Sequence, residues 1–406
     1  MLRESALSHN LALMARYAER HGFLLAPHAK TTLSPQLIRR QLDAGAWGAT
    51  VANATQVAVA VRAGARRVLV ANEVVAATDA ALLVAQARSG AELYCLVDSV
   101  RGVELLDGAL GAACVAPTRE QGAQAMPAES FAAGEARSRP VPPRLGVLVE
   151  LGRPGGRCGV RTVADAVPVA EAVSRALHLD LVGVEGYEGV VGADRSQAVL
   201  DEVDRYLGDV RELVGELGER GLLESRTPVL VSAGGSRFFD RVAAVLGDRS
   251  AYGALEVHLV VRSGCYLTHD HGAYAAASPL AGTGRPGEGL VPALEAWAEV
   301  LSVPEPGLAI VGLGKRDVPY DLGLPVPLHL ARGRGPVVDL AGGRVTALDD
   351  QHGYLRDASD GAGDLLPGDR VGFGLSHPCT AFDKWEVVPV VDDDWRVVDA
   401  VRTYFG

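Results

Sequence analysis

The first 265 or so residues consist of short apolar runs that alternate with longer segments of helical periodicity. Between the runs, segments such as 34–45 and 162–179 carry apolar residues at helical spacing, after a Ser or Thr that can cap a helix. Eight such strand–helix units in series predict a parallel (β/α)8 barrel of the TIM type rather than an open sheet. The eight predicted strands are 23–31, 47–53, 66–74, 92–99, 144–152, 179–189, 228–236 and 256–264.

The pattern changes after about residue 275, where short strand-like runs are broken by Gly, Pro and Asp turns. We therefore expect two domains, a barrel over 1–270 and a mostly β domain over 271–406. Residues 116–143 are rich in Ala, Pro, Gly and charge, which predicts a flexible surface insertion in the barrel.

Composition excludes several classes of function. The net charge of −11 argues against a nucleic-acid surface, which needs a basic patch. The N-terminal segment has the pattern of an amphipathic helix rather than a signal peptide, and no apolar run is long enough to span a membrane. Five scattered cysteines suit a reducing compartment. We expect a cytoplasmic, soluble protein.

Barrel enzymes place their reactive groups at the carboxyl ends of the strands. Lys30 follows the first predicted strand, and a lysine whose pKa is lowered in a barrel mouth becomes a nucleophile for carbonyls. The alternative is an ordinary solvated lysine at a strand end.

A Gly-rich segment follows the seventh predicted strand and precedes a predicted helix. Its small residues would let backbone amides approach a phosphate, at the place where barrels often bind one. Arginines past the fifth and eighth strands and a tyrosine after the sixth could complete a cradle for an anionic aromatic cofactor, or the arginines could form ion pairs on the rim. The candidates are Ser232, Gly234, Gly235, Arg262, Gly264, Cys265, Arg157 and Tyr187.

His377 and Cys379 form a possible metal pair. On an extended segment, residues two apart point to the same side, so an imidazole and a thiolate could hold one ion. Catalytic zinc usually has three protein ligands, which leaves room for Asp350, His352 or Asp383. A lone His-x-Cys is also common by chance.

Six segments, in this order, resemble the pyridoxal phosphate (PLP) enzymes of the D-serine dehydratase and D-threonine aldolase family, which have the alanine racemase fold. They are PHAKTTLSPQL (27–37), DAGAWGATVAN (43–53), VEGYEGV (184–190), SAGGSRFFD (232–240), RSGCYLTHD (262–270) and SHPCTAFDKW (376–385). Segment 314–321 is similar to a branch often labelled amino-acid deaminase.

The resemblance implies a role for each candidate. Lys30 is then the Schiff-base lysine, Arg157 contacts the ring hydroxyl of the cofactor, and Tyr187 lies against its pyridine ring. The backbone around Gly234, Gly235, Gly264 and Cys265 holds the phosphate. His377 and Cys379 match the family's metal pair. Relatives with His-x-Cys bind zinc and are dehydratases, whereas His-x-Asp is typical of aldolases that use manganese-like ions.

We therefore expect a PLP- and zinc-dependent lyase that eliminates water from β-hydroxy-D-amino acids to give a 2-keto acid and ammonia. A retro-aldol lyase that releases glycine and an aldehyde is the close alternative, with His352 or a metal-bound water as its base. A racemase would need an acid–base group opposite Lys30, for which Tyr320 and Tyr354 are candidates. A PLP-binding protein without turnover is the remaining alternative. The resemblance also implies a homodimer.

Overall fold

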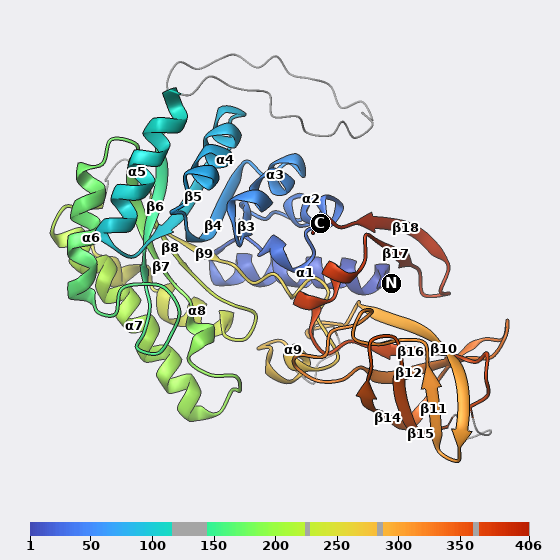
Figure 1. The fold of residues 1–406 in the computed structure, drawn as a ribbon. Helices are drawn as coiled ribbons and strands as arrows, with labels where there is room; N and C mark the ends of the chain where they lie inside the picture. The colour runs from blue at the N-terminus through green and yellow to red at the C-terminus, as the bar shows by residue number, and fades with distance from the viewer. Residues whose placement is uncertain (116–143, 224–227, 282–286, 360–364, 406) are drawn as a thin grey trace.

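The computed structural model describes residues 1–115, 144–223, 228–281, 287–359 and 365–405, so the predicted insertion at 116–143 lies outside the described residues. An eight-stranded parallel sheet curls into a barrel-like wall at the N-terminal end of the chain (Figure 1), as predicted. All eight predicted strands are present. In sequence order they are β2 (Leu24–Leu25), β3 (Ala49–Val51), β4 (Arg67–Glu73), β5 (Glu92–Val97), β6 (Leu145–Leu151), β7 (Leu179–Gly186), β8 (Val229–Ala233) and β9 (Val257–Val261).

The ladder runs in the order β2-β9-β8-β7-β6-β5-β4-β3, so β2 and β3 are its two edges. These edges meet through backbone bonds rather than a full ladder. Trp47 donates to the carbonyl of Leu25 at 2.8 Å, and Thr50 donates to that of Pro27 at 2.9 Å. β2 is shorter than predicted because Pro27 has no N–H and a 3-10 turn, η1 (Ala29–Thr31), begins two residues later.

The two faces of the sheet belong to two separate apolar clusters. Val147 and Val149 pack with the outer helices, whereas Leu148 packs with Leu96, Leu230 and other residues on the opposite, inner face. This is the period-two alternation of a strand. Continuing along the inner face by two residues leads from Leu148 to Glu150, from Leu230 to Ser232 and from Val260 to Arg262. The inner apolar layer therefore ends where the polar candidate residues begin.

Helices cover the outside of the sheet (Figure 1). Of the predicted caps, Thr162 caps a helix by accepting from Asp165 N, whereas Ser34 precedes a helix without a side-chain cap bond. Asn53 caps a further helix by accepting from Gln56 N. The helices are α1 (Glu4–His21), α2 (Pro35–Asp43), α3 (Ala54–Arg62), α4 (Ala77–Arg88), α5 (Val100–Val115), α6 (Val163–Arg175), α7 (Gln197–Glu219), α8 (Phe239–Leu246) and α9 (Ala273–Ala277).

The C-terminal part of the chain is mostly β, as predicted. Its main sheet is antiparallel and has the strand order β13-β12-β16-β10-β11-β15-β14. The strands are β10 (Glu295–Glu305), β11 (Leu308–Val311), β12 (Val326–Ala331), β13 (Val337–Asp339), β14 (Ala341–Leu348), β15 (Gly353–Ser359) and β16 (Arg370–Gly374).

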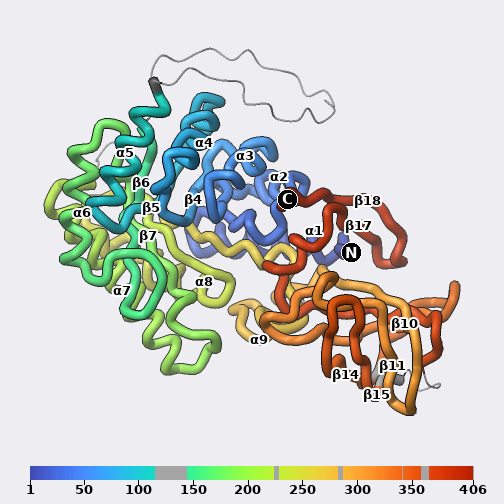
Figure 2. Tube along the Cα trace, in the orientation of Figure 1, coloured from blue at the N-terminus to red at the C-terminus, as the bar shows by residue number. Residues whose placement is uncertain are grey.

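The last two strands return to the N-terminal part of the chain. β17 (Val387–Val391) pairs with β18 (Val397–Arg402) and in parallel with β1 (Leu2–Arg3). Figure 2 shows the red C-terminal trace lying beside the blue N-terminal trace, and Tyr404 N donates to Leu33 O at 3.0 Å. The C-terminal residues therefore hold the loop that follows Lys30.

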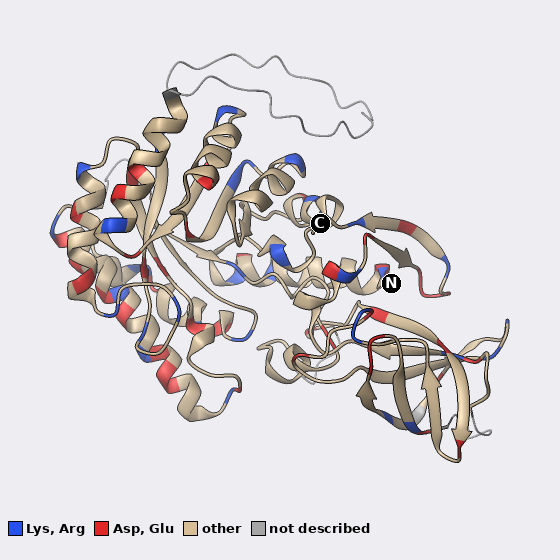
Figure 3. Cartoon of the chain, in the orientation of Figure 1, with Lys and Arg blue, Asp and Glu red and all other residues tan. Residues whose placement is uncertain are grey.

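Acidic and basic side chains are interspersed over the helices and loops (Figure 3). Within the described residues, no helix is both long and apolar enough to cross a bilayer. All five cysteines are free thiols.

Candidate active site

A cavity of about 420 Å³ lies at the carboxyl ends of the barrel strands and extends to the C-terminal domain. This volume is within the usual range for small-molecule and cofactor sites. The predicted site residues that line it are Lys30, Arg157, Tyr187, Gly234, Gly235, Arg262, Gly264, Cys265, His377 and Cys379. Ser232 is not in the lining, but its hydroxyl accepts a hydrogen bond from Arg262 at 3.3 Å. The structure thus gathers at one cavity side chains that are up to 349 positions apart, from Lys30 to Cys379.

Lys30 lies in the η1 turn directly after β2. Its neighbour His28 also lines the cavity, and the Nδ1 atom of His28 is buried without a protein partner. Burial, with added repulsion from Lys30, holds the pKa of His28 well below its usual value. His28 is therefore neutral beside the lysine, with a ring nitrogen free for a ligand.

Arg157 stacks on Tyr187, with its guanidinium carbon 4.7 Å from the ring centroid. The loop that carries Arg157 is held by Arg161, which donates to the carbonyls of Arg157, Cys158 and Gly159. Burial raises the pKa of Tyr187 above its usual value, so the phenol stays protonated. The pair presents a cation and an aromatic face to the cavity.

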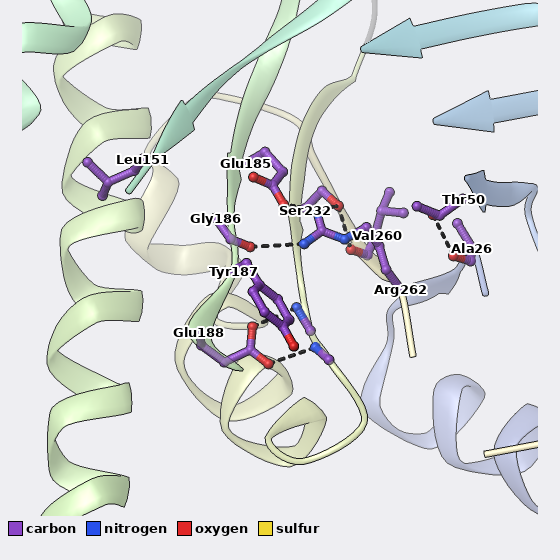
Figure 4. Close-up of polar contacts among 12 residues, drawn as sticks. Ala26, Thr50, Leu151, Glu185, Gly186, Tyr187, Glu188, Ser232, Val260 and Arg262 are labelled. Atoms are coloured by element: carbon purple, nitrogen blue, oxygen red, sulfur yellow. Dashed lines mark hydrogen bonds and ion pairs between the residues drawn. The ribbon is translucent and has the colours of Figure 1, made fainter. Parts of the chain in front are cut away.

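Arg262 is buried and forms an ion pair with Glu185 (Figure 4). It also donates to Ser232 Oγ and to Gly186 O, the latter at 3.2 Å. These contacts span the ends of β7, β8 and β9. The guanidinium is thus fixed against the wall of the cavity.

The backbone amides of the Gly-rich loop bind a side chain of the protein itself, which the sequence did not predict. The carboxylate of Glu188, which is fully buried, accepts hydrogen bonds from Gly234 N at 3.0 Å and Gly235 N at 2.7 Å (Figure 4). Among the described residues, no acceptor pairs with the N–H groups of the other lining positions in this region, Ser236, Gly264 and Cys265. Those three amides, rather than the two that bind Glu188, are free to receive an anion.

Gly264 is required by a close approach of two backbone segments. A Cβ atom there would lie 2.5 Å from His28 O and 2.9 Å from His28 N. Its absence lets the loop after β9 pack directly against the turn that carries Lys30. The phosphate candidates and the lysine are thereby brought to one side of the cavity.

His377 and Cys379 have partners that orient both side chains. Asp321 accepts from His377 Nδ1 at 2.7 Å and from Thr380 Oγ1 at 3.0 Å, which leaves His377 Nε2 available. Cys379 Sγ is 3.2 Å from Cys265 Sγ. The hydrogen bond from Cys379 lowers the pKa of Cys265 to about 6, and the same contact raises the pKa of Cys379.

The residues proposed from sequence to supplement the metal pair do not have this role in the structure. Asp350 contacts Arg316 at 3.4 Å, and neither it, His352 nor Asp383 is in the cavity lining. Asp321 takes the supporting position instead. It stands in the 314–321 segment, whose charged residues were visible in sequence but whose pairing with His377 was not.

Glu150 and Cys158 line the cavity, and Glu73 lies beside them. Atoms of Glu73, Glu150 and Cys158 lie within 4.8 Å of one another. Burial, with repulsion from Glu185 and Glu73, raises the pKa of Glu150 to about 10. Glu150 is therefore a neutral acid near pH 7. The sequence signal for this cluster was weak: Glu73, Glu150 and Glu185 stand at the ends of three barrel strands.

These features fit the cofactor and the metal that the sequence analysis expects. An anionic aromatic cofactor needs a cavity of suitable size, unpaired amides for its phosphate, a cation and an amine, and all of these line the cavity. A metal-binding histidine generally donates its other ring nitrogen to a carboxylate, as His377 does to Asp321.

Comparisons with known proteins agree with this architecture. Residues 293–391, which include the His377–Cys379 pair, match the putative serine dehydratase domain family. The chain is 26% identical over 347 residues to D-threonine aldolase from Arthrobacter sp, covering 86% of this chain and 76% of that protein. It is 25% identical over 361 residues to 3-hydroxy-D-aspartate aldolase from Paracoccus denitrificans (strain Pd 1222), covering 87% and 78%.

Solved structures extend the likeness over nearly the whole chain. D-threonine aldolase from Filomicrobium marinum superposes with a TM-score of 0.76 at 26% identity, covering 99% of this chain and 94% of that one. D-threo-3-hydroxyaspartate dehydratase from Delftia sp. HT23 superposes with a TM-score of 0.71 at 21% identity, covering 100% of this chain and 96% of that one. Alanine racemase from Clostridium difficile 630 gives 0.60 at 12% identity, covering 98% and 96%, which shows a shared fold. The chain is therefore similar to D-threonine aldolase and 3-hydroxy-D-aspartate aldolase over most of its length, it has the alanine racemase fold, and its residues 293–391 match the putative serine dehydratase domain family.

Proposed function

We propose that this protein is a PLP-dependent lyase that eliminates water from β-hydroxy-D-amino acids, giving a 2-keto acid and ammonia. The observation that carries the proposal is the convergence of the amine of Lys30 and the His377–Cys379 pair on one cavity. A PLP enzyme that breaks only a Cα–H bond needs no metal beside the cofactor, whereas loss of hydroxide benefits from one.

The residues that would hold PLP are those that present complementary groups to the cavity. Lys30 would attach the cofactor through its aldehyde, and the free amides of Ser236, Gly264 and Cys265 would receive its phosphate. Arg157 and Tyr187 offer a cation and a ring face. Bound PLP supplies an electron sink for negative charge at the substrate Cα.

Lys30 would act as the base at Cα. Once its amine is free and neutral, it accepts the Cα proton from one face of the substrate. Neutral His28 beside it does not add a second positive charge that would oppose this protonation. The cation of Arg157 stacks on the aromatic ring of Tyr187.

His377 and Cys379 would hold zinc, which would stabilise the negative charge on the departing β-oxygen by several kcal/mol. Asp321 fixes the imidazole of His377 so that Nε2 is the available donor. The thiolate favours zinc over manganese, which prefers oxygen ligands.

The retro-aldol reaction is the second candidate, because the D-threonine aldolase of Arthrobacter sp is 26% identical over most of this chain. That reaction needs a base for the β-hydroxyl. His352, which we considered for this role, is exposed and outside the cavity lining, so a metal-bound water would have to serve.

Product analysis separates the two reactions. The purified enzyme is incubated with D-serine and with D-threonine, with and without a chelator. Pyruvate or 2-oxobutyrate is expected, whereas glycine with acetaldehyde would show the aldolase reaction instead. A visible absorbance band that disappears in Lys30→Ala is expected for the cofactor, and a native protein with no bound PLP would overturn the whole proposal.

We also infer a cytoplasmic homodimer, in which the β domain of one subunit covers the barrel mouth of its partner. The five free thiols support a reducing compartment. The exposed Tyr320 and Leu322, at 49% and 44%, lie next to Asp321 and suit a covered surface. Light scattering after size exclusion tests the dimer, and a monomer at micromolar concentration would contradict it.

A further inference from the structure

Two cysteines from distant parts of the chain meet at the metal pair. Cys265 follows β9 of the barrel, and Cys379 lies in the short turn η4 (Pro378–Thr380) of the C-terminal domain, 114 positions later. Their Sγ atoms are 3.2 Å apart, and both line the cavity. Neutral thiols are weak hydrogen-bonding groups, so such a contact gains little by itself. Two sulfurs held this close in a cavity are arranged to share a ligand.

The surroundings of the pair suit thiolates. Thr31, next to Lys30, places its Oγ1 3.5 Å from Cys379 Sγ and 3.7 Å from Cys265 Sγ. Cys265 is only 5% exposed, so its sulfur is shielded from solvent on the side away from the cavity. A bridging hydroxyl can donate to a negatively charged sulfur. The two sulfurs thus face the cavity as one unit.

His377 supplies a third donor from the same side. It precedes Cys379 by two residues, lines the same cavity and keeps Nε2 free because Nδ1 is bound to Asp321. Catalytic zinc generally has three protein ligands and one open position. His377 and Cys379 alone would provide two, and the nearest further soft donor is Cys265.

Building on the proposed function, we propose that Cys265 is the third protein ligand of the metal, so that the site is His377, Cys379 and Cys265. The fourth position is then open for the β-oxygen of the substrate. With Zn–S bonds of about 2.3 Å and tetrahedral angles, the two sulfurs would be about 3.8 Å apart. The pair therefore has to open by about half an ångström from its observed 3.2 Å separation. The imidazole of His377 also has to move towards the sulfurs, because the donor atoms of the three residues do not all lie within 4.8 Å of one another.

The assignment has two consequences. Two thiolates and an imidazole form a soft donor set, which selects zinc or cobalt over manganese or magnesium. The metal would also link the loop after β9 to the C-terminal domain.

Cobalt spectroscopy of the metal-free protein tests the assignment without substrate or turnover. The protein is kept reduced with a phosphine and titrated with Co²⁺, and the sulfur-to-cobalt charge-transfer band is measured in the near ultraviolet. Because each thiolate contributes to this band, its intensity per bound cobalt is expected to fall by about half in Cys265→Ser and in Cys379→Ser. Cys114→Ser, a matched change at the end of α5, should leave it unchanged.

X-ray absorption of the zinc-loaded wild-type protein counts the sulfur neighbours without any variant. Two sulfur scatterers at about 2.3 Å are expected. One sulfur, or a cobalt band that depends on Cys379 but not on Cys265, would overturn the proposal while leaving the two-ligand site of the proposed function intact. A cobalt band unaffected by either variant would overturn both metal assignments, and the Lys30-dependent absorbance would still report on the cofactor.

Discussion

Because Arg262 and Glu185 form a buried ion pair, removing one or the other should lower the free energy of unfolding with a different pH dependence. Their side chains are 4% and 2% exposed. Glu185→Leu removes the carboxylate and leaves a guanidinium that cannot lose its proton, and its remaining hydrogen-bond partners, Ser232 Oγ and Gly186 O, are neutral. Breaking a buried pair in this way costs about 3–5 kcal/mol. We expect that loss at every pH between about 5 and 8, because the stranded charge does not titrate there.

Arg262→Met leaves the carboxyl of Glu185 without its partner, and this carboxyl can become neutral by binding a proton. Burial raises the pKa of Glu185, and Arg262 opposes that rise, so the pKa climbs further when the arginine is removed. A carboxyl with a raised folded pKa contributes stability that is fully present below its unfolded value and is lost as pH rises through the folded pKa. The variant should therefore lose about 1.4 kcal/mol of stability per pH unit above about pH 4.3, up to that folded pKa.

Urea unfolding of the protein without cofactor or metal, followed by circular dichroism at pH 5 and pH 7.5, measures both effects. Glu219→Leu, on an exposed part of α7, is the matched control and should change the free energy of unfolding by less than about 0.5 kcal/mol. The double variant Glu185→Leu/Arg262→Met should recover most of the loss, because no charge is left unpaired. The reasoning fails if Glu185→Leu costs under about 1 kcal/mol, or if the cost of Arg262→Met is the same at both pH values.

Three further predictions concern the metal pair and the loop near it. Asp321→Ala should weaken metal binding by about 10- to 100-fold in a competition titration, because His377 loses the carboxylate that orients it, and an unchanged Kd would contradict this. Burial, together with the nearby His271, lowers the pKa of His269 to about 4, so its stability contribution is present above pH 6.5 and lost as pH falls towards 4. His269→Asn, which tolerates the φ of 47°, should flatten the pH dependence of unfolding in that window, and an unchanged slope would refute it. In the metal-free protein, hydrogen peroxide should convert the thiols of Cys265 and Cys379 to a disulfide with release of two waters. Mass spectrometry would detect this as a loss of two hydrogens. If the metal-bound protein reacted equally, the result would argue against a shared metal site.

The barrel was predictable because its strands are short apolar runs that alternate in a regular order with helical segments, and such a series has few other stable arrangements. The predicted strand at 144–152 became β6, Leu145–Leu151, almost unchanged. The predicted strand at 23–31 shortened to Leu24–Leu25, because Pro27 and the approach of Gly264 turn the chain away from the sheet. That deviation places Lys30 in the cavity lining.

The site was predictable as a set of residues but not as a set of contacts. Lys30 and Arg262 could be placed at the cavity because parallel strands end at one edge. The bond from Gly234 N to Glu188 and the bond from His377 to Asp321 depend on how loops pack against one another, and no periodicity in the sequence encodes such packing. Sequence reasoning therefore assigned the glycine amides to a phosphate, whereas in the structure a buried carboxylate accepts from two of them.

The position of the metal pair explains why the two domains have to be fixed relative to each other. Cys379 comes from the C-terminal domain, and the turn that holds Lys30 comes from the barrel. Several backbone connections join these parts. Among them, β1 pairs in parallel with β17, Arg3 N donates to Ala293 O, and Tyr404 N donates to Leu33 O, three residues after Lys30. If Lys30 and the metal pair act as we propose, a shift of one domain by even an ångström would separate the amine from the metal while leaving each domain folded. The C-terminal strands would then act on the chemistry through the distance between two groups that neither domain could set alone.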